Sequence, residues 1–139
     1  AGFSRLVELK IYVNGELLSI YNADGIIVST PTGSTGYSLS AGGPIIFPQT
    51  DVMVITPICP HSLQARSLVV SGEDRIMIEI GRRRKTQREE AMVTFDGRSA
   101  QELETGDRIE IYKAQETTQL IRLKGRSFYQ VLQNKIGTA

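Results

Sequence analysis

The chain has 139 residues, and its 16 Lys or Arg and 15 Asp or Glu give a formal net charge of +1. This length suffices for one domain with a hydrophobic core, and the balanced charge gives no electrostatic reason to expect nucleic acid or an anionic membrane as a partner. No apolar run approaches the ~20 residues of a membrane-spanning helix and the N-terminus lacks the plan of a signal peptide, so we expect a cytoplasmic location.

The first predicted element is a β-hairpin. Polar and apolar residues alternate over residues 6–13, which places the apolar side chains on one face of a strand. Asn14-Gly15 is a pair that two-residue hairpin turns favour, and residues 16–21 return as the second strand. Because the chain has no initiator Met and enters a strand almost at once, we expect it to be a fragment of a longer protein.

A third strand is predicted over residues 25–30, and a loop rich in glycine and hydroxyl groups follows it as far as Gly43. Glycine lets a backbone approach a ligand closely, and Ser, Thr and free N–H groups can then bind phosphate, ribose or base edges. Residues 35–41 could start a short helix whose N–H groups face an anion, and Tyr37 could stack on a base. The loop matches neither the P-loop nor the dinucleotide fingerprint, so a Ser/Gly-rich surface loop is the alternative.

The rest of the chain predicts further short strands and one helix. Cys59 excludes an internal disulfide and favours a reducing compartment, and its apolar surroundings predict a buried, inert thiol. The basic run 82–85 is closed by Glu89-Glu90, which predicts a solvated hairpin tip and not a nucleic-acid site. Apolar spacing predicts a helix over residues 127–136. The predicted strands are residues 52–58, 67–70, 74–80, 91–95, 108–112 and 119–123.

These elements predict an all-β fold in which two sheets pack as a β-sandwich-like single domain over residues 1–139, with a short helix in the central loop and a C-terminal helix. There is no alternation of strands and helices. A binding site must therefore be built from loops and strand ends.

Several ordered motifs resemble the C-terminal domain of the NAD kinase family. They are Asp24-Gly25, the segment from Ser29 to Tyr37, Ser40, Gly42-Gly43-Pro44, the segment from Thr56 to Leu63, Arg66, and Phe95-Asp96-Gly97-Arg98. The family usually has Ala where Gly36 stands. The resemblance implies an enzyme that transfers the γ-phosphate of ATP to the adenosine ribose 2′-hydroxyl of NAD, giving NADP.

The resemblance also implies which parts of that enzyme are present. The family's Gly-Gly-Asp-Gly loop, which supplies the catalytic aspartate and helps hold ATP, is absent from these 139 residues, so no catalytic residue is expected here. A divalent metal such as Mg²⁺ would act with ATP in the intact enzyme, and no metal or cofactor is expected to bind this domain alone. The domain would bind NAD or NADP and form a homo-oligomer, either a dimer or a tetramer, without nucleic acid or membrane as a partner.

Carried over by position, the resemblance assigns the NAD pocket to residues around the central loop. Thr35 and Tyr37 would lie beside the adenosine, and Asp24 could accept a hydrogen bond from an amino or amide group or simply cap a turn. The substrate-binding residues implied are Asp24, Thr32, Thr35, Gly36, Tyr37, Ser38, Leu39 and Ser40, with Arg5, Asn22 and Arg98 as further candidates.

Two residues of the connection after the fourth predicted strand are given structural roles. His61, the only histidine, is expected to fix this connection by hydrogen bonds, and Arg66 to pin the same corner. With no other metal ligands clustered nearby, a protein-built metal site is not expected.

Two alternatives stay open. Diacylglycerol and sphingosine kinases share the two-domain plan, and a non-catalytic nucleotide-binding β-module would need no chemistry at all.

Overall fold

The computed structural model describes residues 7–32, 39, 41–81, 91–95 and 98–115, with the backbone alone for 91–95 and 98–100. Within these ranges the chain is built from β-strands, and no helix among them has the length and apolar character needed to span a membrane. The strands are β1 (Val7–Val13), β2 (Glu16–Ala23), β3 (Gly25–Ser29), β4 (Val52–Ile58), β5 (Leu68–Ser71), β6 (Ile76–Ile80), β7 (Ala91–Phe95), β8 (Arg98–Leu103) and β9 (Arg108–Ile111).

The predicted N-terminal hairpin is confirmed. β1 and β2 pair antiparallel from Val13 opposite Glu16. The two turn residues have positive φ, 51° at Asn14 and 85° at Gly15, as a type I′ turn requires. A β-bulge interrupts the register near Tyr12, so both Leu17 and Leu18 are exposed on the outer part of β2.

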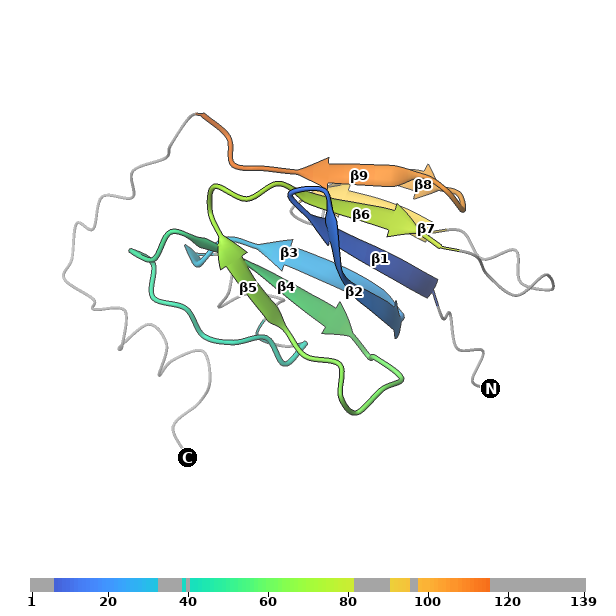
Figure 1. Cartoon of the computed structure of the whole chain (residues 1–139), viewed down its shortest axis with the longest axis horizontal. Coiled ribbons are helices and arrows are strands. Elements are labelled where there is room, and N and C mark those ends of the chain that lie inside the picture. The colour runs from blue at the N-terminus through green and yellow to red at the C-terminus, as the bar shows by residue number, and fades with distance from the viewer. Residues whose placement is uncertain (1–6, 33–38, 40, 82–90, 96–97, 116–139) are drawn as a thin grey trace.

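The strands form two packed antiparallel sheets and a separate two-stranded ribbon. One sheet has the order β2-β1-β6-β9 and the other has the order β3-β4-β5, while β7 pairs with β8. In Figure 1, β9 and β6 lie at the top, and the three-stranded sheet lies lower, at the level of β1 and β2. The all-β, two-sheet prediction is therefore confirmed. The predicted strand at 119–123, the C-terminal helix and almost all of the short helix in the central loop lie outside the described residues.

The core lies between the two sheets. Alternate residues of β1 and β6 face it, which is why Ile11 and Ile76 are fully buried. β4 contributes Ile55 from the opposite sheet, and Ile26 and Val28 of β3 pack against the same cluster. Because β4 is the central strand of its sheet and is buried on both faces, it fixes the position of β3, from whose end the loop starts.

Three observations correct or extend the sequence predictions. Cys59 is exposed, not buried, because β4 ends at Ile58 and the backbone at Cys59 takes a positive φ of 47° that turns the chain outward. β8 was not among the predicted strands. The basic run lies outside the described residues, and since β6 pairs with β1 and β9 while β7 pairs with β8, the described strands that flank the run are not partners in one hairpin.

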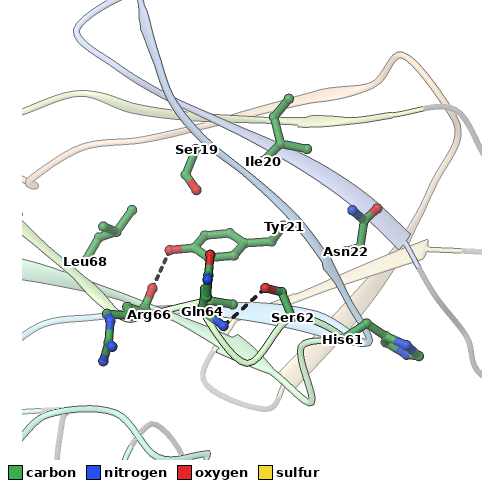
Figure 2. A pocket seen from close by; sticks show the side chains of 10 residues that line it. Ser19, Ile20, Tyr21, Asn22, His61, Ser62, Gln64, Arg66 and Leu68 are labelled. Atoms are coloured by element: carbon green, nitrogen blue, oxygen red, sulfur yellow. Dashed lines mark hydrogen bonds between the residues drawn. The ribbon is translucent and has the colours of Figure 1, made fainter.

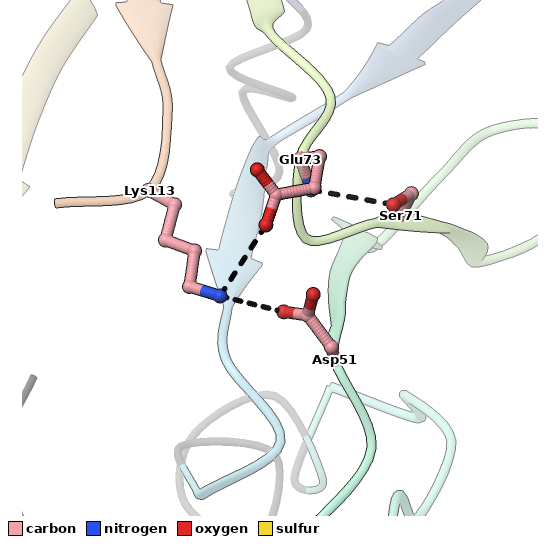
Figure 3. Close-up of polar contacts among 4 residues, drawn as sticks. All are labelled: Asp51, Ser71, Glu73 and Lys113. Atoms are coloured by element: carbon pink, nitrogen blue, oxygen red, sulfur yellow. Dashed lines mark hydrogen bonds and ion pairs between the residues drawn. The ribbon is translucent and has the colours of Figure 1, made fainter. Parts of the chain in front are cut away.

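An exposed ion cluster holds the segment after β9 against the three-stranded sheet. Lys113 Nζ lies 3.0 Å from Asp51 Oδ1 and 3.5 Å from Glu73 Oε1 (Figure 3). The hydrogen bond and the charge of Asp51 raise the pKa of Lys113 above its ordinary value, with a smaller contribution from Glu73. Because all three side chains are solvated, the cluster guides the chain and adds little stability.

Candidate functional site

The candidate nucleotide loop starts where β3 ends. Ser29, the last residue of β3, is paired with Val54 of the central strand, so the start of the loop is held by the sheet. Thr30 and Thr32 are exposed on either side of the buried Pro31. Near the far end of the loop, Gly42 donates its N–H to the Leu39 carbonyl (3.0 Å) and has a φ of +87°, which favours glycine at this turn.

A row of hydroxyl groups lies on the face of β3 and β4 that points away from the other sheet. Ile26 and Val28 face the core, so Ser29 and Ile27 face outward, as does Thr56, the partner of Ile27. The Thr56 hydroxyl is hydrogen-bonded to Ser67 Oγ at 3.3 Å. Ser29 Oγ is buried and has no hydrogen-bond partner among the described residues. An unpaired hydroxyl of this kind is unfavourable, and it lies directly before the candidate loop.

The described members of the predicted site fall into two groups at opposite ends of β3. Asn22 and Asp24 are exposed where β2 turns into β3, and Asp24 donates its N–H to the Ile58 carbonyl (2.9 Å). The exposed Thr32 and the half-buried Leu39 belong to the loop at the other end. Four steps of β-strand separate the ends by about 13 Å. Within the described residues, the structure therefore does not bring the two groups together.

The remaining predicted site residues lie in β8 or outside the described residues. Arg98 opens β8 opposite Phe95, and its side chain is not described. Six predicted residues lie outside the described residues: Arg5, Thr35, Gly36, Tyr37, Ser38 and Ser40.

An open cleft of about 520 Å³ lies at the Asn22 end, between β2 and the connection that joins β4 to β5. Figure 2 shows the Tyr21 ring reaching from β2 toward this connection. The lining has one arginine and no carboxylate. The lining residues are Ser19, Ile20, Tyr21, Asn22, His61, Ser62, Gln64, Ala65, Arg66 and Leu68.

Hydrogen bonds hold the connection in place along β2. The His61 N–H donates to the Asn22 carbonyl (3.0 Å), and the Tyr21 hydroxyl donates to the Arg66 carbonyl (2.6 Å). Between these contacts, the Ser62 carbonyl accepts from the Ala65 N–H (3.1 Å), and Ser62 Oγ accepts from the Gln64 N–H (3.2 Å). The wall of the cleft is therefore preformed.

His61 and Arg66 hold the connection in place, as predicted, but they do so through backbone groups and not through their side chains. The imidazole and the guanidinium are both exposed at the cleft and have no hydrogen-bond or ion-pair partner among the described residues. Sequence reasoning had linked Asn22 to the site but not Ser62 or Gln64. The only available signal was the short Pro-His-Ser-Leu connection itself, because nothing in the sequence shows that it folds onto β2.

Tyr21→Phe is expected to lower the free energy of unfolding by about 1 kcal/mol, since it removes one hydrogen bond that fixes the connection. Burial raises the pKa of Tyr21 above 10.0, against a smaller opposing effect of the hydrogen bond to Ser19. A pKa that is higher in the folded state means that stability is lost as pH rises above about 10. Urea unfolding at pH 8 and at higher pH should show a smaller alkaline loss in Tyr21→Phe than in wild type. An equal loss in both would contradict the assignment.

No three His, Cys, Asp or Glu side chains in the described part of the chain gather closely enough to hold a metal ion. The residues that line the cleft thus offer binding groups for a polar ligand, namely hydroxyls, amides, backbone N–H groups and one arginine. They offer no nucleophile paired with a base. This chemistry suits the binding of a polar ligand.

Comparison with known proteins gives one consistent family. A family model described as the ATP-NAD kinase C-terminal domain matches residues 2–123. Two curated relatives named NAD kinase are those of Lachnoclostridium phytofermentans, 53% identical over 137 residues, and Agathobacter rectalis, 49% identical over 136 residues. These alignments cover 99% and 98% of this chain and 48% of each relative. The chain therefore spans about half the length of the curated relatives that it matches.

Solved structures agree with the sequence relatives. A crystal structure of a yeast NADH kinase complexed with NADH matches 77% of this chain and 30% of its own chain, with a TM-score of 0.69 and 41% identity. An Archaeoglobus fulgidus NAD kinase in complex with ATP matches 82% of this chain and 42% of its own, with a TM-score of 0.69 and 29% identity. These names support the NAD branch of kinases and not the lipid-kinase alternative.

Proposed function

Because the chain belongs to the ATP-NAD kinase C-terminal domain family, we propose that it is the NAD-holding part of an enzyme that phosphorylates NAD with ATP to give NADP. The observation that carries this proposal is the glycine- and hydroxyl-rich loop that leaves β3 at Ser29, next to a central strand buried on both faces. A loop whose first residue is held by the sheet can present donors and acceptors to a dinucleotide.

In this proposal the domain contributes position and not bond-making groups. Phosphoryl transfer depends on alignment and on neutralisation of charge more than on covalent help from the protein. Orientation of two reactants can lower a barrier by roughly 7 to 11 kcal/mol. Thr32, Leu39 and the residues between Thr35 and Ser40 would hold the adenosine end of NAD, and Asp24, with Asn22 as a further candidate, would contact another part of the ligand.

The ATP-binding and catalytic groups of the proposed enzyme lie outside the 139 residues, since the chain contains no Gly-Gly-Asp-Gly loop. A divalent metal would neutralise charge on the phosphates of ATP. The described residues offer no cluster of ligands for it, and ATP itself would supply phosphate oxygens as ligands.

Titration of NAD into the chain tests the proposed pocket directly. The double variant Thr35→Ala, Tyr37→Phe removes two hydroxyls and keeps the aromatic ring, and we expect at least a tenfold loss of affinity, which is about 1.4 kcal/mol. The double variant Thr105→Ala, Tyr112→Phe makes the same chemical changes on either side of β9, at residues outside the predicted site, and should bind as wild type does. Equal affinity of both variants for NAD would mean that the loop does not form the NAD pocket.

A kinase assay tests the division of labour. The longer protein that carries this chain should form NADP from NAD and ATP, while the chain alone should form none and act only as a nucleotide-binding module. NADP made by the purified chain would contradict the proposal that this chain binds NAD and that other residues carry out the phosphoryl transfer. Diacylglycerol in place of NAD should not be phosphorylated.

Two further expectations belong to this proposal. The enzyme would act in the cytoplasm, which the single, exposed Cys59 suits because nothing in the chain needs an oxidising compartment. The chain would also associate with copies of itself, which sedimentation velocity can measure.

A further inference from the structure

One hydroxyl group in the three-stranded sheet is buried without a hydrogen bond. Ser29 Oγ is closed to solvent, and it is the one buried side-chain oxygen or nitrogen in the described part of the chain that has no partner there. A buried hydroxyl without a partner is unfavourable, because water bonds the same group in the unfolded chain. Such groups are rare in native proteins and are often functional.

The local sequence explains why this hydroxyl has no partner. A serine side chain outside regular helix commonly accepts a hydrogen bond from the backbone N–H two residues ahead. For Ser29 that residue is Pro31, which has no N–H. Across the sheet, Ser29 lies opposite Val54, whose side chain has no polar atom. Both positions from which a strand-end serine would usually be bonded therefore lack a donor.

The neighbouring hydroxyl groups on the same face differ from that of Ser29. Thr56 and Ser67 are hydrogen-bonded to each other, with 3.3 Å between Thr56 Oγ1 and Ser67 Oγ. Val54 also points away from the core, yet it is fully buried, so this face is closed to water beside Ser29. A ligand in solution cannot touch Ser29 Oγ directly. An effect of Ser29 on a ligand must therefore pass through the chain next to it.

We propose that Ser29 is a positioning residue for the dinucleotide: its hydroxyl gains a hydrogen bond with a backbone group of Pro31 or Thr32 when the dinucleotide binds. Thr32 is exposed, belongs to the predicted site and lies three residues beyond Ser29. A ligand that contacts Thr32 acts on the backbone directly beside the hydroxyl. Ser29 itself is held by the sheet through its pairing with β4, so the adjustment needs no movement of the strands.

The inference rests on the proposed function and adds to it a residue outside the predicted site. In the free chain the unpaired hydroxyl raises the free energy of the native state. In the bound chain the hydroxyl is paired, so this unfavourable contribution disappears on binding and adds to the affinity. Ser29 therefore makes the free chain less stable and the complex tighter, which is the kind of exchange of stability for function that binding sites show.

Ser29→Ala tests this exchange, because it removes the hydroxyl and little else. Urea unfolding of the chain without NAD should give a midpoint equal to or above that of wild type. Titration of NAD should give an affinity that is lower by roughly fivefold, as expected for the loss of one hydrogen bond made only in the complex. The two measurements should thus change in opposite directions, or stability should stay constant while affinity falls.

Ser67→Ala is the matched control, since it makes the same substitution beside the same face at a hydroxyl that is already paired with Thr56. It should lower the urea midpoint and leave the affinity for NAD unchanged. If Ser29→Ala lowers the midpoint as Ser67→Ala does, the Ser29 hydroxyl is bonded in the free chain and the inference is wrong.

The affinities separate this inference from the function on which it rests. A wild-type chain that does not bind NAD overturns both. A wild-type chain that binds NAD, with Ser29→Ala binding equally well, overturns the role of Ser29 and leaves the proposed function standing.

Steady-state kinetics of the longer protein that carries this chain give a further readout. Ser29→Ala should raise KM for NAD by roughly fivefold and leave kcat and KM for ATP unchanged, because the lost interaction serves the binding of NAD alone. A purely structural defect would instead reduce the amount of active enzyme, and so lower kcat. A lower kcat with an unchanged KM for NAD would contradict the positioning role.

Discussion

Ile55→Ala is expected to lower the free energy of unfolding by about 3 to 4 kcal/mol. Ile55 is fully buried in the central strand β4, and it pairs with Val28 on one side and Leu68 on the other. Alanine would leave a cavity where the two sheets meet, and removal of a buried isoleucine costs 2 to 5 kcal/mol in general. Because the free energy of unfolding of a domain is only about 5 to 15 kcal/mol, this change would remove a large part of it. Urea unfolding with a constant m-value is the measurement.

Two substitutions separate the cavity effect from a loss of apolar surface in general. Ile55→Val should cost about 1 kcal/mol. Ile20→Ala removes the same atoms as Ile55→Ala from a residue that is half exposed on the edge strand, and should change stability by less than about 1 kcal/mol. A loss at Ile55 no larger than that at Ile20 would mean that β4 does not form the core between the sheets.

Much of the fold could be predicted because its strands are short, amphipathic and separated by turn residues. The alternation in β1 and β6 gave the correct buried face, and Asn14-Gly15 gave the hairpin. The pairing of β1 with β6 could not be predicted, because strands so far apart in sequence leave no local signal of their contact. Cys59 was misjudged for a related reason. Its apolar neighbours suggested burial, but the positive φ that turns it outward depends on the three-dimensional path.

The sequence predicts the loop of the candidate site, but it does not predict the cleft. The composition of the segment after β3, which is rich in glycine and hydroxyl groups, indicates a ligand-binding loop. The motifs around it indicate the family. The assignment of Asn22 and Asp24 to the same pocket as Thr32 rests on motifs alone, and the structure adds that β3 lies between the two groups. The cleft at Asn22 was missed because it depends on the backbone of His61 and Arg66 meeting β2.

Asn14→Ala should lower the free energy of unfolding by about 2 to 3 kcal/mol, although Asn14 is exposed. Its side chain donates to Asp74 Oδ1 and accepts from the Arg75 N–H, both at 2.9 Å. Each bond is worth about 1 kcal/mol, and alanine at a φ of 51° adds about 1 kcal/mol of backbone strain. Chemical unfolding at neutral pH measures the loss.

Two further variants at Asn14 divide this cost into its parts. Asn14→Gly loses the hydrogen bonds but accepts the positive φ, so it should lose about 1 kcal/mol less than alanine. Asn14→Asp keeps the acceptor for Arg75 but places a carboxylate against Asp74, so its loss should be larger at pH 7 than near pH 4, where carboxylates take up protons. Equal losses of unfolding free energy in Asn14→Gly and Asn14→Ala would mean that backbone strain does not contribute to the effect. A pH-independent loss for aspartate would mean that Asn14 does not fasten the hairpin turn to the start of β6.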